Sequence, residues 1–166
     1  ILCCRTEHEL DLKLRRKIAK FCNVSMNAVI EAKDAESIYD VPILMQEEEL
    51  DKVVLEKLHL PIKSSPSLTK WKAFTKKLKN PEKQTTIGLI GKYVELKDSY
   101  KSISEAIIHA GVSNNSKVNV KWIHSEKLTE NNVDNELKDL NGILVAPGFG
   151  SRGIPGKICA VTYARE

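Results

Sequence analysis

The second half of the chain alternates short β-branched runs with helix-like segments, and this alternation limits the fold more than any other feature. Strands are expected at residues 85–90, 117–123 and 142–145. Helices are expected at 98–110, around Val133, Leu137 and Leu140, and from 158 to 164. In the first of these helices, Asp98 or Ser99 is the expected N-cap and Gly111 the expected stop. Alternating elements with short connections predict a parallel, right-handed α/β sheet.

The last expected strand leads into a loop that holds four glycines and two prolines within residues 147–156. Ligands of parallel sheets bind beyond the carboxyl ends of the strands, so this loop and the turn at 91–93 are expected at one edge. Backbone N–H groups of Gly148, Phe149 and Gly150 could form an oxyanion hole or an anion nest. A plain strand-to-helix turn is the alternative. The G-x-G-x-x-G spacing of the loop is not a dinucleotide fingerprint, because it follows a third strand.

Residues 1–60 are expected to be the end of a larger α/β domain. A helix is predicted at 12–21, a strand at 28–32 and a helix from about Pro42 to Leu58. Two helices and one or two strands cannot bury an adequate core alone. Residues 61–84 contain two Pro-containing breaks around a short amphipathic segment, which predicts an interdomain linker. The domains are therefore expected at 1–60 and 85–166.

Composition and residue spacing restrict the binding partners and the cellular compartment that are expected for the chain. The 26 basic and 22 acidic residues leave a net charge of only +4 and are scattered, which argues against a nucleic-acid polymer as partner. No apolar run reaches the ~18 residues of a membrane span. Cys3, Cys4, Cys22 and Cys159 lack C-x-x-C spacing and are expected to be buried, reduced thiols of a cytoplasmic protein. The four histidines lie far apart, so no metal site is predicted.

Several short segments occur in the order and spacing of one enzyme family. They are Cys-Arg-Thr at 4–6, Lys-Ile-Ala-Lys-Phe-Cys-Asn-Val at 17–24, Lys-Asp-Ala-Glu-Ser-Ile-Tyr at 33–39, Val-Pro at 41–42, Ile-Gly-Leu-Ile-Gly-Lys-Tyr at 87–93, Asp-Ser-Tyr-Lys at 98–101, Gly-Phe-Gly at 148–150, Arg-Gly at 152–153 and Tyr-Ala-Arg-Glu at 163–166. With these segments the chain resembles the central portion of the CTP synthase family. Members of this family make CTP from UTP, ATP and glutamine-derived ammonia.

The resemblance implies a domain order and a set of roles. Residues 1–60 would be the C-terminal end of a P-loop-type amidoligase (synthetase) domain, and 85–166 the first half of a parallel-sheet class I glutamine amidotransferase domain. The implied roles are contact with UTP or CTP for Lys17, the adenine side of ATP for Lys33, Asp34 and Ala35, and glutamine and its oxyanion for Gly148 and Phe149. Without the family, Lys17 would be a solvated lysine and 33–35 a polar turn.

One position departs from the family pattern. The family usually has Pro-Gly-Gly-Phe-Gly, whereas this chain has Ala-Pro-Gly-Phe-Gly at 146–150. Pro147 has no N–H, so the N–H of Gly148 is expected to carry the donor role.

The resemblance also implies cofactors, an activator and an assembly for the whole enzyme. Mg²⁺ and ATP are the expected cofactors, GTP the expected activator, and a cytoplasmic homotetramer the expected assembly. No nucleophile is assigned, because Cys159 is expected inside a helix and lacks the G-x-C-x-G turn. The chain starts on Ile1 and is expected to be an internal, inactive piece of the enzyme. Two alternatives are a non-catalytic nucleotide-binding or assembly module with a degenerate amidotransferase lobe, which Pro147 favours, and another class I amidotransferase.

Overall fold

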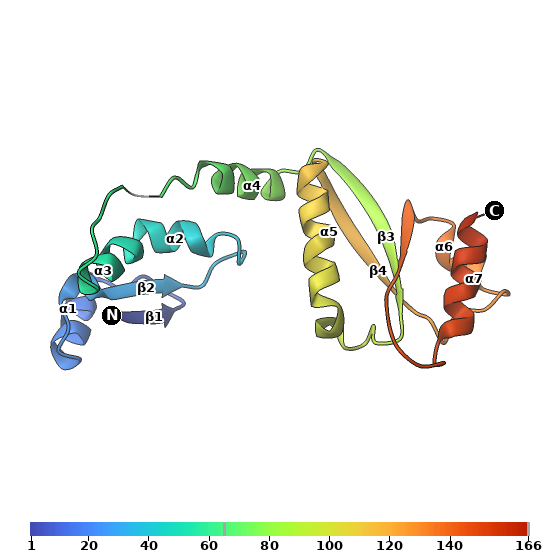
Figure 1. Cartoon of the computed structure of the whole chain (residues 1–166), viewed down its shortest axis with the longest axis horizontal. Coiled ribbons are helices and arrows are strands. Elements are labelled where there is room, and N and C mark those ends of the chain that lie inside the picture. The colour runs from blue at the N-terminus through green and yellow to red at the C-terminus, as the bar shows by residue number, and fades with distance from the viewer. Residues whose placement is uncertain (65, 166) are drawn as a thin grey trace. The chain divides into compact units, whose positions relative to one another are not determined.

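The protein consists of two compact units, Ile1–Thr75 and Lys76–Glu166 (Figure 1). The computed structural model describes residues 1–64 and 66–165, apart from the side chain of Lys97. Both units combine helices with a sheet of parallel strands. The prediction of a mixed α/β fold with parallel sheets is therefore confirmed.

The first unit is a two-stranded parallel sheet covered by helices. Its elements are β1 (Leu2–Thr6), α1 (Leu12–Phe21), the 3-10 helix η1 (Met26–Ala28), β2 (Val29–Lys33), α2 (Val41–Glu47) and α3 (Leu50–Lys57). Its small core joins Ala28 and Ile30 to Val53 of α3. The helix predicted at 12–21 is confirmed, and the side chain of Asp11 accepts a hydrogen bond from the Leu14 N–H at 2.6 Å as its N-cap.

Two features of this unit differ from the sequence expectations. The strand β1 was not predicted, because its backbone hydrogen bonds are made with β2, which is distant in the sequence. Leu2 lies opposite Val29 and Thr6 opposite Lys33. The single helix predicted from Pro42 to Leu58 is wrong. The chain breaks between α2 and α3 at Glu49, whose φ of 56° is left-handed and cannot continue a helix.

A cluster of charged side chains ties α1 to β2 and to the end of α2. The guanidinium group of Arg15 donates two hydrogen bonds to Glu48, at 2.7 and 3.1 Å, and a third to the Val29 carbonyl at 3.0 Å. Glu48 also accepts from the Glu31 N–H, and Glu31 accepts from the Leu10 N–H. Every member of this part-buried cluster therefore has an opposite charge or a backbone partner.

The helix α4 (Thr69–Lys79) begins in the first unit and ends in the second. Its Trp71 donates a hydrogen bond to the Tyr39 carbonyl at 2.7 Å, and the Trp71 and Phe74 rings lie 5.9 and 5.1 Å from that of Tyr39. The aromatic face of α4 thus packs on the first unit.

The second unit is a three-stranded parallel sheet with helices on both faces (Figure 1). Its elements are β3 (Lys83–Gly91), the 3-10 helix η2 (Lys97–Tyr100), α5 (Lys101–Ser113), β4 (Ser116–His124), α6 (Val133–Leu137), β5 (Gly142–Val145) and α7 (Ile154–Arg165). The strand order is β4-β3-β5. Leu89 and Ile90 of the central strand β3 are both fully buried and point to opposite faces, Leu89 toward α5 and Ile90 toward α6 and α7.

The three strands of this unit are confirmed, but several helix ends differ from the predictions. No side chain caps α5, which follows η2 at Tyr100 rather than starting at Asp98 or Ser99. Gly111 does not stop α5; it lies inside the helix, where a Cβ would come within 2.6 Å of the Ser116 carbonyl oxygen. The helix α7 starts at Ile154, four residues before the expected Ile158, because proline is accepted in a first turn.

The prediction of buried thiols is wrong for two of the four cysteines. All four are free, but Cys3 and Cys22 are exposed, and Cys4 and Cys159 are half-buried. Cys3 lies on β1, where alternate side chains face solvent because the sheet has only two strands.

Candidate functional site

The candidate site lies at the carboxyl edge of the second unit's sheet, where three loops meet. The Ser125 N–H donates to the Gly91 carbonyl and the Ala146 N–H donates to the Ile90 carbonyl, both at 2.8 Å. These bonds extend the pairing of β4 and β5 with β3 past the last ladder residues. As the sequence predicted, the turn at 91–93 and the glycine loop after β5 share one edge.

The glycine loop presents free backbone donors. Among the described residues, the N–H groups of Gly148, Phe149 and Gly150 donate to no acceptor. The three residues are exposed, and the Phe149 side chain is 97% exposed. Gly150 has a φ of 77°, which L side chains rarely adopt, and nothing lies within 4 Å of the place where its Cβ would be. Free N–H groups in such a turn form the kind of concave site that binds anions.

Two buried lysines contact the backbone of the glycine loop. Lys92 and Lys157 are only 7% and 8% exposed. The Lys157 ammonium donates to the Ala146 carbonyl at 2.7 Å, and the Lys92 ammonium donates to the Phe149 carbonyl. Both nitrogens lie 3.7 Å from the position that a Cβ of Gly148 would occupy. In the part of the chain that the structure describes, neither lysine forms an ion pair.

The turn after β3 is fixed by Tyr100, which is buried. Its hydroxyl oxygen accepts from the N–H groups of Lys92 and Tyr93, at 3.2 and 3.3 Å. A Cβ on Gly91 would lie 2.5 Å from the same oxygen, so only glycine fits there. Tyr100 therefore fixes the backbone of Lys92 and, with it, the base of the Lys92 side chain.

Arg152, the other cation of the loop, is already partnered. Its guanidinium lies 3.2 Å from a carboxylate oxygen of Glu126 and 5.2 Å from the centre of the Tyr93 ring. Its charge is balanced by Glu126, whereas the charges of Lys92 and Lys157 are not. The buried lysines therefore give this edge its excess positive charge.

In the first unit, Lys33 is the last residue of β2 and lies opposite Thr6 of β1, and the predicted residues Asp34 and Ala35 come directly after it. The Asp34 N–H donates to the Thr6 carbonyl at 2.9 Å, and the Asp34 carboxylate accepts from Arg5 at 3.0 Å. Lys33 lies 3.5 Å from Glu9. The charged side chains of this turn are thus paired with Arg5 of β1 and with Glu9, which follows it.

Lys17 lies on α1 and is exposed. No hydrogen bond or ion pair joins its side chain to the turn at 33–35 among the described residues. The structure therefore brings Lys33, Asp34 and Ala35 together at one edge, and Gly148 and Phe149 at another, without linking Lys17 to either.

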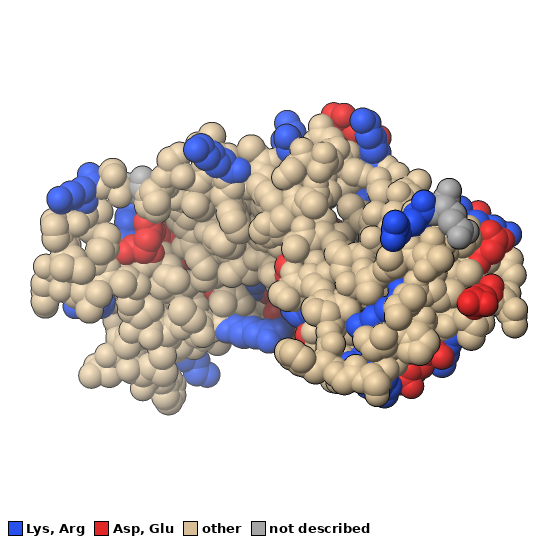
Figure 2. All heavy atoms as spheres, turned by 45° about the vertical axis from the view of Figure 1, so that its right-hand side comes forward, with Lys and Arg blue, Asp and Glu red and all other residues tan. Residues whose placement is uncertain are grey.

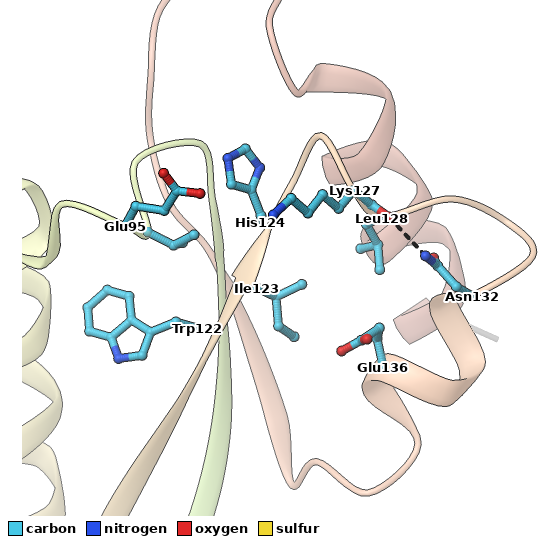
Figure 3. A pocket seen from close by; sticks show the side chains of 9 residues that line it. Glu95, Trp122, Ile123, His124, Lys127, Leu128, Asn132 and Glu136 are labelled. Carbon is cyan, nitrogen blue, oxygen red and sulfur yellow. Dashed lines mark hydrogen bonds between the residues drawn. The ribbon is translucent and has the colours of Figure 1, made fainter.

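A separate cavity of about 310 Å³ opens beside the end of β4 (Figure 3). Its walls carry Glu95, His124, Lys127 and Glu136 around the ring of Trp122. None of the residues proposed from the sequence lines it. Glu136 is paired with Lys121 at 2.8 Å, and His124 accepts from the Glu126 N–H, so these groups already have partners.

Acidic and basic side chains are mixed on the face drawn in Figure 2. Within residues 1–64 and 66–165, no group of three or more His, Cys, Asp or Glu side chains is placed to hold a metal ion. None of the helices described is long and apolar enough to cross a membrane.

Sequence reasoning missed the two lysine side chains. Lys157 lay outside every expected element, between the loop at 147–156 and the helix expected from Ile158. Once α7 begins at Ile154, Lys157 lies on the same side as Gly156 and Ala160, both of which are buried. Lys92 was recognised only as part of a turn. One signal could have identified Lys92: it directly follows the carboxyl end of a strand, at the sheet edge where the glycine loop is expected.

Comparison with known proteins gives two family matches in chain order. Residues 1–60 match the CTP synthase N-terminus, and residues 95–166 match the class-I glutamine amidotransferase family. The CTP synthase of Flavobacterium psychrophilum is 63% identical over 166 residues, which is the whole of this chain and 31% of that protein.

Two further relatives also match over the whole chain. The CTP synthase of Cytophaga hutchinsonii is 59% identical over the whole chain and 31% of its own length. That of Methanocaldococcus jannaschii is 52% identical over 173 residues, 32% of its length. The chain thus spans about a third of the length of the curated relatives that it matches. From these matches and the resemblance of its segments, we conclude that the chain belongs to the CTP synthase family.

Proposed function

We propose that this chain is the part of a CTP synthase that runs from the end of the amidoligase domain, through a linker, into the first half of the glutamine amidotransferase domain. The whole enzyme would form CTP by ATP-dependent amination of UTP with ammonia from glutamine. The observation that carries the proposal is the row of N–H groups at 148–150 that have no acceptor within the described part of the chain, next to two buried ammonium groups without a described carboxylate partner.

The loop residues would act when glutamine is hydrolysed. A thiolate attacks the carboxamide carbon, and the π electron pair of the C=O bond moves onto oxygen. The N–H of Gly148 donates to this oxyanion, and that of Phe149 lies next to it along the chain. Pro147 cannot contribute a donor. The oxyanion then re-forms the C=O bond as the amide nitrogen accepts a proton and leaves as ammonia, and water hydrolyses the resulting thioester to release glutamate and the thiolate.

The attacking thiolate would come from outside this chain. Cys159 lies in the middle of α7 and not on a turn between a strand and a helix. We expect the 166-residue chain alone to turn over neither glutamine nor UTP. Glutamine hydrolysis by the purified chain would contradict this assignment.

In the first unit, Lys17 would contact the triphosphate of UTP or CTP, because an exposed ammonium is a compact charge suited to phosphate. The turn at 33–35 would hold the adenine side of ATP, with its ion pairs rearranging around the nucleotide. GTP would activate glutamine hydrolysis, and the enzyme would be a cytoplasmic homotetramer. Mg²⁺ would accompany ATP in the whole enzyme.

The test is CTP formation by a protein of the relatives' full length that contains this chain. With UTP, ATP and Mg²⁺, we expect CTP to form with either glutamine or ammonia as nitrogen donor. CTP formation with ammonia only would favour a degenerate amidotransferase lobe. No CTP with either donor would contradict the proposal and favour the non-catalytic module.

A further inference from the structure

The shape of the glycine loop depends on two lysines that reach it from different elements. Lys92 follows β3, the central strand, and Lys157 lies in the first turn and a half of α7. Each buried ammonium group donates to one loop carbonyl, Lys157 to that of Ala146 and Lys92 to that of Phe149. The loop is therefore fixed at two points by side chains from outside it.

The peptide groups with the proposed oxyanion donors lie between the two hydrogen-bonded carbonyls in the sequence. Between the Ala146 and Phe149 carbonyls lie the peptide groups that carry the N–H of Gly148 and the N–H of Phe149. Among the described residues, no other hydrogen bond holds these two peptide groups. Because glycine leaves the backbone free to rotate at position 148, the direction of both donors depends on the two lysine contacts.

Stability alone does not account for the two lysines. Burying an ammonium group is costly unless an opposite charge compensates it, and none of the described residues supplies one to either lysine. Both nitrogens lie 3.7 Å from the Cβ position of Gly148, so their charges act directly beside the donors. A fixed positive potential at the point where negative charge develops stabilises the transition state of acyl transfer.

We infer that Lys92 and Lys157 are positioning residues for glutamine hydrolysis. They hold the peptide groups of Gly148 and Phe149 with both N–H groups directed outward, and they raise the positive potential at the oxyanion. This role rests on the proposed function. Neither lysine needs to touch glutamine, since each acts through a backbone carbonyl.

Steady-state kinetics of a Lys157→Met variant in the full-length protein test this role. Methionine keeps much of the length and apolar stem of lysine and removes the charge and the donor. We expect kcat for glutamine hydrolysis to fall about 10- to 100-fold, less than the loss of an oxyanion donor itself, with KM changed less than about threefold. CTP formation from added ammonia should be unchanged. Lys138→Met, at an exposed position of the same unit, is the matched control.

The outcomes separate this inference from the proposed function. If the unmodified protein hydrolyses glutamine and Lys157→Met does so with the same kcat, the positioning role is wrong. If the unmodified protein hydrolyses no glutamine, the proposed function fails first. Equal losses with glutamine and with ammonia would show a general structural effect and would also overturn the role.

A spectroscopic measurement keeps the inference testable if one variant does not fold in the full-length protein. In ¹⁵N–¹H spectra of the 166-residue chain, Lys157→Met and, separately, Lys92→Met should shift the amide signals of Gly148 and Phe149. Amide signals of β4, such as that of Val120, should stay in place. Unchanged signals of Gly148 and Phe149 in both variants would contradict the proposed contacts.

Discussion

The two units each contain a cluster of shielded charges, and the clusters differ in how the charge is balanced. In the first unit, Arg15 is enclosed by Glu48 and Glu31, with hydrogen bonds to the Glu48 carboxylate and to the Val29 carbonyl. In the second, the Lys92 and Lys157 ammonium groups donate to backbone carbonyls, and Lys92 also lies 5.3 Å from the centre of the Tyr93 ring, but neither has a carboxylate partner among the described residues. A balanced cluster holds a fold together, whereas an unbalanced one beside free N–H donors is suited to an anion that arrives from outside.

The largest effect is expected from breaking the balanced cluster. Arg15→Ala leaves two carboxylates, Glu48 and Glu31, without their cation, so we expect the first unit to lose about 3 kcal/mol of its free energy of unfolding. Each unit has one tryptophan, Trp71 or Trp122, so denaturant unfolding followed by Trp71 fluorescence in a Trp122→Phe background reports the first unit.

Lys13→Ala is the control for this change. Lys13 is exposed on the same helix, and its removal should change the free energy of unfolding by less than about 0.5 kcal/mol. Equal effects of Arg15→Ala and Lys13→Ala would show that the cluster does not stabilise the fold.

A smaller effect is expected from acid. The hydrogen bonds from Arg15 hold the pKa of Glu48 below its usual value of 4.5, partly opposed by burial, and the Glu31 N–H lowers it further. Because the pKa is lower in the folded state, the stabilisation is complete above about pH 4.5 and is lost as the pH falls through the folded pKa.

The acid effect is measured as the unfolding midpoint of the first unit between about pH 7 and about pH 3. In Glu48→Gln the midpoint should fall less over this range than in the unmodified chain. The same fall in both proteins would mean that another carboxylate is responsible.

The smallest change in stability is expected from the unbalanced pair. Lys157→Met removes one hydrogen bond but also removes a buried charge, so the free energy of unfolding should change by less than about 1 kcal/mol. Trp122 fluorescence in a Trp71→Phe background reports this unit. A loss as large as that of Arg15→Ala would remove the distinction between the two clusters.

Local signals in the sequence predicted much of the fold. The helix α1 and the strand β5 have the predicted bounds, because a side-chain N-cap and a short apolar run between glycine and proline are local features. The parallel direction of the strands in the second unit was predicted from the alternation of strands and helices alone. The expected meeting of the loop at 147–156 with the turn at 91–93 followed from the rule that parallel strands share a carboxyl edge.

Other features depend on tertiary contacts that no local pattern reveals. Glu49 takes a left-handed conformation without being glycine, so the break between α2 and α3 had no sequence signal. Gly111 suggested a helix end, yet it allows α5 to lie close to Ser116. The burial of Lys157 requires knowing both where α7 starts and what it packs against. The roles of Lys17 and of 33–35 stay predictions.

The most direct test of the central claim, that the Gly148 N–H is the oxyanion donor, compares two substitutions at one position. Gly148→Pro removes the N–H, and Gly148→Ala keeps it while adding a Cβ 3.1 Å from the Lys92 side chain. In the full-length protein, Gly148→Pro should lower the kcat of glutamine hydrolysis about 100-fold and Gly148→Ala less than about tenfold. CTP formation from ammonia should be preserved in both. Equal losses of glutamine hydrolysis in the two variants would contradict the claim.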